Sequence, residues 1–131
     1  MICADTSSFI AYWEGDPGSD AGFVDRALVD GNLRLAFVTV TELLSDPALS
    51  PRLERLVMSV PRLEISAGYW ERAGRLQAKL SSHGYRHKLA DSLIAQSCLD
   101  HDLPLITRDR DFVAFEKLAG LKLLTGGARV Q

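Results

Sequence analysis

The sequence has no long apolar run and very little cysteine. No apolar stretch approaches the roughly 20 residues that a helix needs to span a bilayer. The first residues also lack the basic region and long apolar segment of a signal peptide. The two cysteines, Cys3 and Cys98, form no CxxC motif and each lies in an apolar stretch, so we expect reduced thiols in the core. These absences argue against a membrane protein and a disulfide scaffold, and they favour a cytoplasmic location.

The sequence also lacks an excess of basic residues. It has 15 lysine and arginine residues against 17 aspartate and glutamate residues, which gives a formal net charge of −2. Proteins that hold nucleic acid through bulk electrostatics are usually basic. Any nucleic-acid binding by this chain must therefore come from a local basic patch or from bound cations.

Length and patterning are those of one α/β domain. With 131 residues, 47% of them hydrophobic, the chain can bury a sizeable core, and it shows no internal repeat or linker, so we expect a single domain over residues 1–131. Short β-rich runs alternate with longer helical patterns, which predicts βαβ units and a parallel sheet. Strands are expected at 2–5, 33–38, 62–65, 103–107 and 121–124. Helices are expected at 7–13, 20–30, from about 41 onward, at 52–58, from a cap at 66 to about 84, at 89–99 and at 112–118.

Acidic residues follow several of the expected strands. Ligands of open parallel sheets bind at the carboxyl ends of the strands. Asp5 ends the first strand, Glu42 follows the second at an expected helix start, and Asp109 follows the fourth. Asp91 lies in the first turn of a mostly apolar helix, where a buried carboxylate needs a partner. Each acid alone could be a helix cap, and Asp111 is expected only to cap the helix that follows it.

Several carboxylates at one edge of a sheet need compensation. Carboxylates within a few ångströms repel one another, and no lysine or arginine is placed among all of these in sequence. A hard divalent cation would compensate their charge. All-oxygen ligands suit Mg²⁺ or Mn²⁺, and the lack of a Cys/His cluster argues against zinc. Such a cation can activate a water and neutralise the charge that develops on a phosphodiester.

Four segments resemble the motifs of one known family. They are ICADTSS at residues 2–8, VTVTELL at 38–44, Gly84 followed by DSLIA at 91–95, and LITRDRDF at 105–112. Each segment is weak evidence alone, but all four occur in order and at suitable spacing. Together they resemble a PIN-domain protein, specifically a VapC-type toxin of a bacterial or archaeal toxin–antitoxin pair, over nearly the whole chain.

The resemblance implies a three-layer α/β/α sandwich with a five-stranded parallel sheet and a Mg²⁺- or Mn²⁺-dependent endoribonuclease. It also implies frequent homodimerisation and a cognate antitoxin whose C-terminal segment covers the active site. The acidic quartet would consist of Asp5, Glu42, Asp91 and Asp109. Asp5 and Asp91 would be the central metal ligands, and the other two would bind directly or through water. Thr6 and Thr107 would orient these carboxylates through hydrogen bonds. Residues 45–50 follow the second motif where family members vary, and could reshape one rim of the site.

Basic residues near the acids are candidates for binding substrate phosphates. They are Arg86, His87 and Lys88, just before the third motif, and Arg108 and Arg110, which bracket the last acid of the quartet. These residues could explain how a mildly acidic protein holds RNA. An equal alternative is that they are solvated charges on loops with no role in binding. His87 could assist proton transfer, although metal-bound water does not require it.

Two other functions fit parts of the pattern. A phospho-accepting receiver-like domain would need an acidic pair after the first strand and a lysine after the last, whereas Asp5 has no acidic neighbour and Lys122 lies within its expected strand. A catalytically silent PIN scaffold that only binds proteins is the remaining alternative, against which the complete quartet argues. Specificity for single-stranded RNA depends on loop shape and stacking, so the RNA target stays open.

Overall fold

The centre of the structure is a sheet of four parallel strands. The computed structural model describes residues 1–125. The sheet has the order β2–β1–β3–β4, with β1 (Ile2–Ala4), β2 (Leu33–Arg34), β3 (Leu105–Thr107) and β4 (Leu123–Thr125). Cys3 of β1 pairs with Arg34 on one side and with Leu105 on the other. The central strands β1 and β3 are therefore neighbours, and their carboxyl ends meet at one edge of the sheet.

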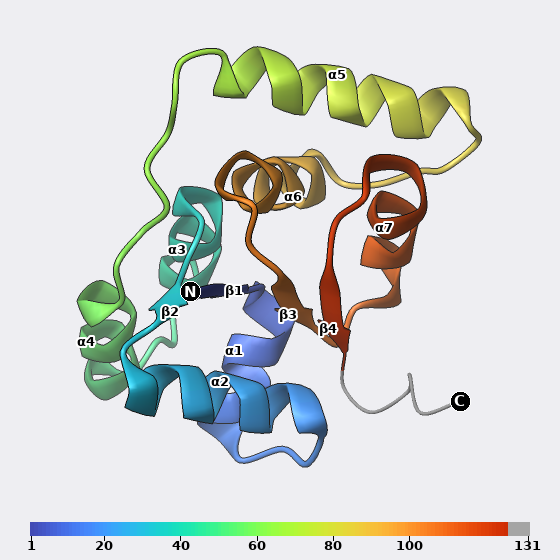
Figure 1. Ribbon diagram of the computed structural model, residues 1–131. Helices are drawn as coiled ribbons and strands as arrows, with labels where there is room; N and C mark the ends of the chain where they lie inside the picture. The colour runs from blue at the N-terminus through green and yellow to red at the C-terminus, as the bar shows by residue number, and fades with distance from the viewer. Residues whose placement is uncertain (126–131) are drawn as a thin grey trace.

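Helices cover both faces of the sheet, so the predicted three-layer α/β/α sandwich is confirmed (Figure 1). The helices are α1 (Thr6–Glu14), α2 (Ser19–Asp30), α3 (Phe37–Leu44), α4 (Pro51–Ser59), α5 (Tyr69–Ser82), α6 (Leu89–His101), the short 3₁₀ helix η1 (Arg110–Phe112) and α7 (Val113–Ala119). Core side chains of α5, α6 and α7 pack on one face, and those of α1, α2, α3 and α4 pack on the other. Within residues 1–125, no helix is both long and apolar enough to cross a membrane.

Successive residues of the central strands supply the two halves of the core. Cys3 and Leu105 pack against the α5–α6–α7 face, whereas Ala4 and Ile106 pack against the other face. This alternation follows from the pleat of a strand, and burial on both faces explains why the strands are apolar throughout. Cys3 and Cys98 are free and fully buried, as the sequence predicts.

The prediction of a fifth strand at residues 62–65 is wrong. It is reduced to one parallel bridge between Leu35 and Arg62. The expected strand at 33–38 is also too long, because α3 already begins at Phe37 and turns the chain out of the sheet. Pro61 contributes only its carbonyl to this pairing, to the amide of Leu35, because proline has no amide hydrogen to donate.

Candidate active site

Asp5 lies at the carboxyl end of β1, where it caps helix α1. Its carboxylate is 3% exposed and accepts hydrogen bonds from the Ser8 amide (3.0 Å), the Thr107 hydroxyl (2.6 Å) and the Ser7 hydroxyl, which reaches both oxygens (2.9 and 3.0 Å). Burial raises the pKa of Asp5, the hydrogen bonds lower it in part, and Asp109 raises it further, so that the net shift is upward. The predicted orienting role of Thr107 agrees with this geometry.

The segment after β3 carries two more acids, Asp109 and Asp111, of which Asp109 acts on the Asp5 carboxylate. The Thr107 hydroxyl also accepts a hydrogen bond from the Asp109 amide (2.9 Å). Asp109 in turn caps η1 by accepting from the Asp111 amide (2.9 Å). The expectation that Asp111 caps the following helix is therefore wrong: Asp109 is the cap of η1, and the Asp111 side chain is exposed.

Glu42 comes from the last turn of α3 rather than from a helix start, because α3 begins five residues earlier at Phe37. Its carboxylate accepts a hydrogen bond from the Thr6 hydroxyl (2.7 Å) in the first turn of α1. This bond agrees with the predicted role of Thr6 as a residue that orients a carboxylate of the quartet. The bond joins two helices on the side of the sheet where β1 ends.

Asp91 is the electrostatic centre of the group. It lies in the first turn of α6 and is 8% exposed, and within residues 1–125 its carboxylate accepts no hydrogen bond from another group. Its pKa is raised from 3.8 to about 6, by burial first and then by Asp109, Asp111 and Glu42, against a smaller opposing effect of Lys88. Asp109 raises the pKa of both Asp5 and Asp91, and Glu42 raises that of Asp91, so the four predicted acids are electrostatically linked.

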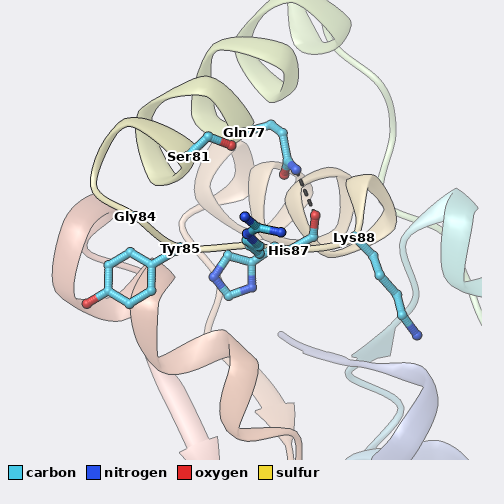
Figure 2. Close-up of a pocket in the computed structure, with 7 residues that line it drawn as sticks. Gln77, Ser81, Gly84, Tyr85, His87 and Lys88 are labelled. Carbon is cyan, nitrogen blue, oxygen red and sulfur yellow. Dashed lines mark hydrogen bonds between the residues drawn. The ribbon is translucent and has the colours of Figure 1, made fainter.

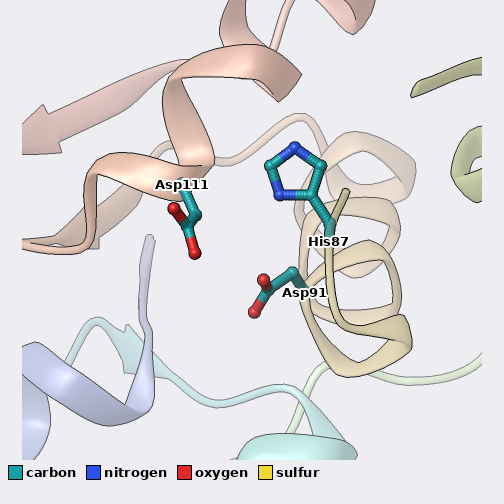
Figure 3. A group of neighbouring side chains, drawn as sticks. All are labelled: His87, Asp91 and Asp111. Carbon is teal, nitrogen blue, oxygen red and sulfur yellow. The ribbon is translucent and has the colours of Figure 1, made fainter. Parts of the chain in front are cut away.

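The tightest group of potential metal ligands in the described part of the chain is His87, Asp91 and Asp111. One ligand atom of each lies within 4.8 Å of the other two (Figure 3). Sequence reasoning did not treat His87 or Asp111 as ligands. The spacing of four residues between His87 and Asp91, which can place two side chains on one face at a helix start, was the available signal.

The predicted basic residues divide into two groups. Arg86, His87 and Lys88 line a pocket of about 670 Å³ beside α5, and Figure 2 shows Tyr85 and Lys88 flanking His87 along the connecting segment. Arg110 is exposed.

Arg108 differs from the other predicted basic residues because its guanidinium already pairs with an acid of the chain, which argues against its expected role in binding substrate phosphates. Its guanidinium forms an ion pair with the fully buried Asp20 (Nε to Oδ2 2.7 Å, Nη2 to Oδ1 3.0 Å) and donates to the Pro17 carbonyl. The Ser8 hydroxyl also donates to Asp20 (2.8 Å). This arrangement ties α2 to the segment after β3.

The residues present fit a divalent cation. The donor set consists of carboxylate oxygens and one imidazole nitrogen, which suits Mg²⁺ or Mn²⁺ and, with the nitrogen, first-row transition metals. The pKa of Asp91 is raised because the chain compensates its negative charge only in part, through Lys88. A cation among these acids would lower that pKa and stabilise the ionised form.

Comparison with known proteins gives the family. The model of the PIN domain matches residues 2–119, so this chain belongs to the PIN-domain family. Among curated proteins it is similar to Ribonuclease VapC5 of Mycobacterium tuberculosis, with 29% identity over an alignment of 132 residues; the match covers 92% of this chain and 91% of that protein. The predicted resemblance to VapC-type proteins is thereby confirmed.

Solved structures share the fold. The chain is similar to VapBC2 from Rickettsia felis bound to a promoter DNA fragment, with 18% identity, a TM-score of 0.72, and 96% and 99% of the two chains covered. It is also similar to VapBC-1 from nontypeable Haemophilus influenzae, with 24% identity, a TM-score of 0.71, and 95% and 98% covered. VapBC-5 from Mycobacterium tuberculosis aligns with 24% identity and a TM-score of 0.67 over 95% and 97%. At these identities the likeness concerns the fold.

Proposed function

We propose that this protein is a divalent-metal-dependent endoribonuclease and the toxin of a type II toxin–antitoxin pair. The observation that carries the proposal is the uncompensated Asp91, which is buried among Glu42, Asp109 and Asp111 at the carboxyl edge of a parallel sheet. A buried carboxylate with a strongly raised pKa and acidic neighbours is typical of a functional site. The similarity to a curated VapC ribonuclease supports RNA as the substrate.

In this proposal Asp5, Glu42, Asp91 and Asp109 hold Mg²⁺ or Mn²⁺. When bound, the metal supplies an activated water and neutralises the charge that develops on the phosphodiester. The chain's own hydrogen bonds fix the carboxylates beforehand: Thr107 orients Asp5, and Thr6 orients Glu42. Such preorganisation removes reorganisation from the reaction itself.

The basic side chains near the acids and the similar solved structures suggest how substrate and partners would bind. Arg86, Lys88 and Arg110 are exposed beside the acids and would bind RNA phosphates. The similar solved structures are toxin–antitoxin complexes, which supports a cognate antitoxin as a partner of this chain, and a homodimer is expected as well. A location in the cytoplasm fits such a system.

Cleavage of RNA by the purified protein tests the proposal. We expect cleavage with Mg²⁺ or Mn²⁺ and none with EDTA. Asp5→Asn and Asp91→Asn should lower the rate to about one hundredth or less, because each removes a charged ligand. Asp30→Asn, in an exposed ion pair with Arg26 on α2, is the matched control and should cleave like the wild type.

Two results would contradict this function. Unchanged cleavage in the Asp5 and Asp91 variants would exclude the metal site as the catalytic centre. Failure to bind millimolar Mg²⁺ or Mn²⁺ in calorimetry would favour a silent protein-binding scaffold instead. Toxicity on expression, relieved by the product of the adjacent open reading frame, tests the toxin role separately.

A further inference from the structure

His87 carries polar atoms that have no polar partner. Its ring packs between the rings of Tyr85 (centroids 5.9 Å apart) and Phe115 (5.0 Å). Both ring nitrogens are buried, and neither has a hydrogen-bond partner in the described part of the chain. Leaving a buried polar group unpaired costs about 1–3 kcal/mol. The ring nitrogens therefore need a ligand that the chain itself does not provide.

The geometry around the ring points to a cation. Ligand atoms of His87, Asp91 and Asp111 lie within 4.8 Å of one another. In Figure 3 the imidazole lies beside the two carboxylates with one ring nitrogen on their side. Three ligands of one ion at bond lengths of about 2.1 Å lie about 3.0–3.6 Å from one another. Side-chain movements of about 0.5–1 Å would thus let all three reach one ion.

The backbone at His87 is held in place by the neighbouring helices. The Gln77 side chain of α5 donates from Nε2 to the His87 carbonyl (2.8 Å), an interaction drawn in Figure 2. The Oε1 atom of Gln77 accepts a hydrogen bond from the Ser92 hydroxyl, next to Asp91 on α6. His87 and Asp91 are therefore fixed relative to each other through one glutamine, as a preformed pair of ligands requires.

We propose that His87, Asp91 and Asp111 form a metal position with one nitrogen and two carboxylate donors, which shares Asp91 with the acidic quartet. The two carboxylates supply two negative charges for a divalent ion, and the imidazole shifts the preference from Mg²⁺ toward Mn²⁺ and later first-row transition metals. The proposal deepens the proposed metal dependence and rests on it. The position differs from the quartet because its donors include a nitrogen and the exposed acid after Asp109.

Binding of Mn²⁺ to the intact chain tests the proposal without any measurement of activity. Free and bound Mn²⁺ are counted by electron paramagnetic resonance, and spin-echo modulation of the bound ion detects a directly coordinated nitrogen. We expect nitrogen modulation in the wild type and its loss in His87→Ala and His87→Phe. The phenylalanine keeps a ring beside Phe115, so it separates loss of a ligand from loss of packing.

The affinities should change selectively. Loss of the imidazole should weaken Mn²⁺ binding at this position by about tenfold or more, with an effect of less than about threefold on Mg²⁺. His83→Ala is the matched control, because His83 is an exposed histidine at the end of α5 whose ring contacts the Lys79 carbonyl. That variant should retain both the nitrogen signal and the affinity of the wild type.

The possible outcomes separate this inference from the proposed function. Bound Mn²⁺ without nitrogen modulation in the wild type would overturn the role of His87 and leave a carboxylate metal site intact. Unchanged Mn²⁺ affinity in both His87 variants would overturn it as well. No Mn²⁺ binding at millimolar concentration would overturn the metal dependence itself.

Discussion

Asp20 and Asp91 are two buried aspartates whose pKa values are shifted in opposite directions. Asp20 is fully buried and Asp91 is 8% exposed. Burial opposes the ionisation of both carboxyls. For Asp20 this effect is outweighed by hydrogen bonds from Arg108 and Ser8, so its pKa falls below the ordinary 3.8, whereas the pKa of Asp91 is raised to about 6. The opposite pKa shifts of the two aspartates therefore come from their neighbouring side chains and not from how deeply each is buried.

This contrast separates a structural acid from the acid that we propose to be functional. The chain supplies Asp20 with its counter-charge, and the pair joins α2 to the segment after β3. Around Asp91 the chain places further acids, and Lys88 compensates only in part. A buried charge that the fold compensates only in part lowers the stability of the folded state, and such a cost is typical of sites that bind a ligand. Four predictions test this contrast.

Removing the charge of Asp20 should give the largest change. Asp20→Asn leaves the guanidinium of Arg108 without its partner, and we expect a loss of about 2–4 kcal/mol in the free energy of unfolding, since Arg108 is one-third exposed and partly solvated. Urea denaturation in EDTA measures it. Asp30→Asn, from an exposed pair, should change the value by less than about 0.5 kcal/mol. Equal losses in the two variants would remove the structural role of Asp20.

The same change at Asp91 should act in the opposite direction. In EDTA at pH 7.5 we expect Asp91→Asn to stabilise the fold by about 1–3 kcal/mol, because it removes a buried charge from among Asp109, Asp111 and Glu42. Saturating Mn²⁺ should raise the melting temperature of the wild type more than that of the variant. A destabilised variant in EDTA would show that Asp91 is compensated after all.

A smaller loss is expected when the link between the two central strands is cut. Thr107→Val removes the hydroxyl that donates to Asp5 and accepts from the Asp109 amide, and should cost about 1–2 kcal/mol. Thr39→Val is the control, because the Thr39 hydroxyl is buried without a hydrogen-bond partner among residues 1–125. That variant should be neutral or slightly stabilised in the same urea titration. Similar losses in both would reduce the role of Thr107 to packing.

The smallest effect is the slope of stability with pH. A carboxyl with a raised folded pKa favours the folded state at low pH, so the contribution of Asp91 is fully present below about pH 3.8 and is lost as pH rises to about 6. The contribution of Asp20, whose folded pKa is lowered, is present above about pH 3.8 and is lost as pH falls further.

The difference between the wild type and Asp91→Asn in EDTA should therefore vanish near pH 4 and grow by about 1 kcal/mol per pH unit up to pH 6. Urea titrations at pH 4, 5, 6 and 7 measure it. A difference that is constant over this range would contradict the raised pKa.

The acids of the site could be predicted from the sequence because their positions are local. Asp5 and Asp109 directly follow apolar strands, and parallel strands end at one edge of a sheet. The predicted start of α3 is wrong because Val38 and Val40 favour strands by propensity. In the structure both lie within α3, where Val38 packs against one half of the core and Val40 belongs to the other.

The partners of the charged residues could not be predicted in this way. Arg108 and Asp20 are 88 residues apart in sequence, and only the packing of α2 beside the end of β3 brings them together. Likewise, the orientation of Asp111 depends on which acid caps η1, a choice between two aspartates in one short segment. Such choices depend on tertiary packing, which local patterns do not encode.

The hydrogen bonds of Asp5 also limit how it can bind an ion. A carboxylate offers about four lone-pair directions. In Asp5 two are used by the Ser8 amide and the Thr107 hydroxyl, and the Ser7 hydroxyl is shared between the two oxygens. The Thr107 oxygen also accepts from the Asp109 amide, which restricts the positions open to its hydrogen. If Asp5 coordinates a metal directly, as we propose, the Ser7 hydroxyl has to rotate away from its carboxylate, so one serine rotamer controls access to this oxygen.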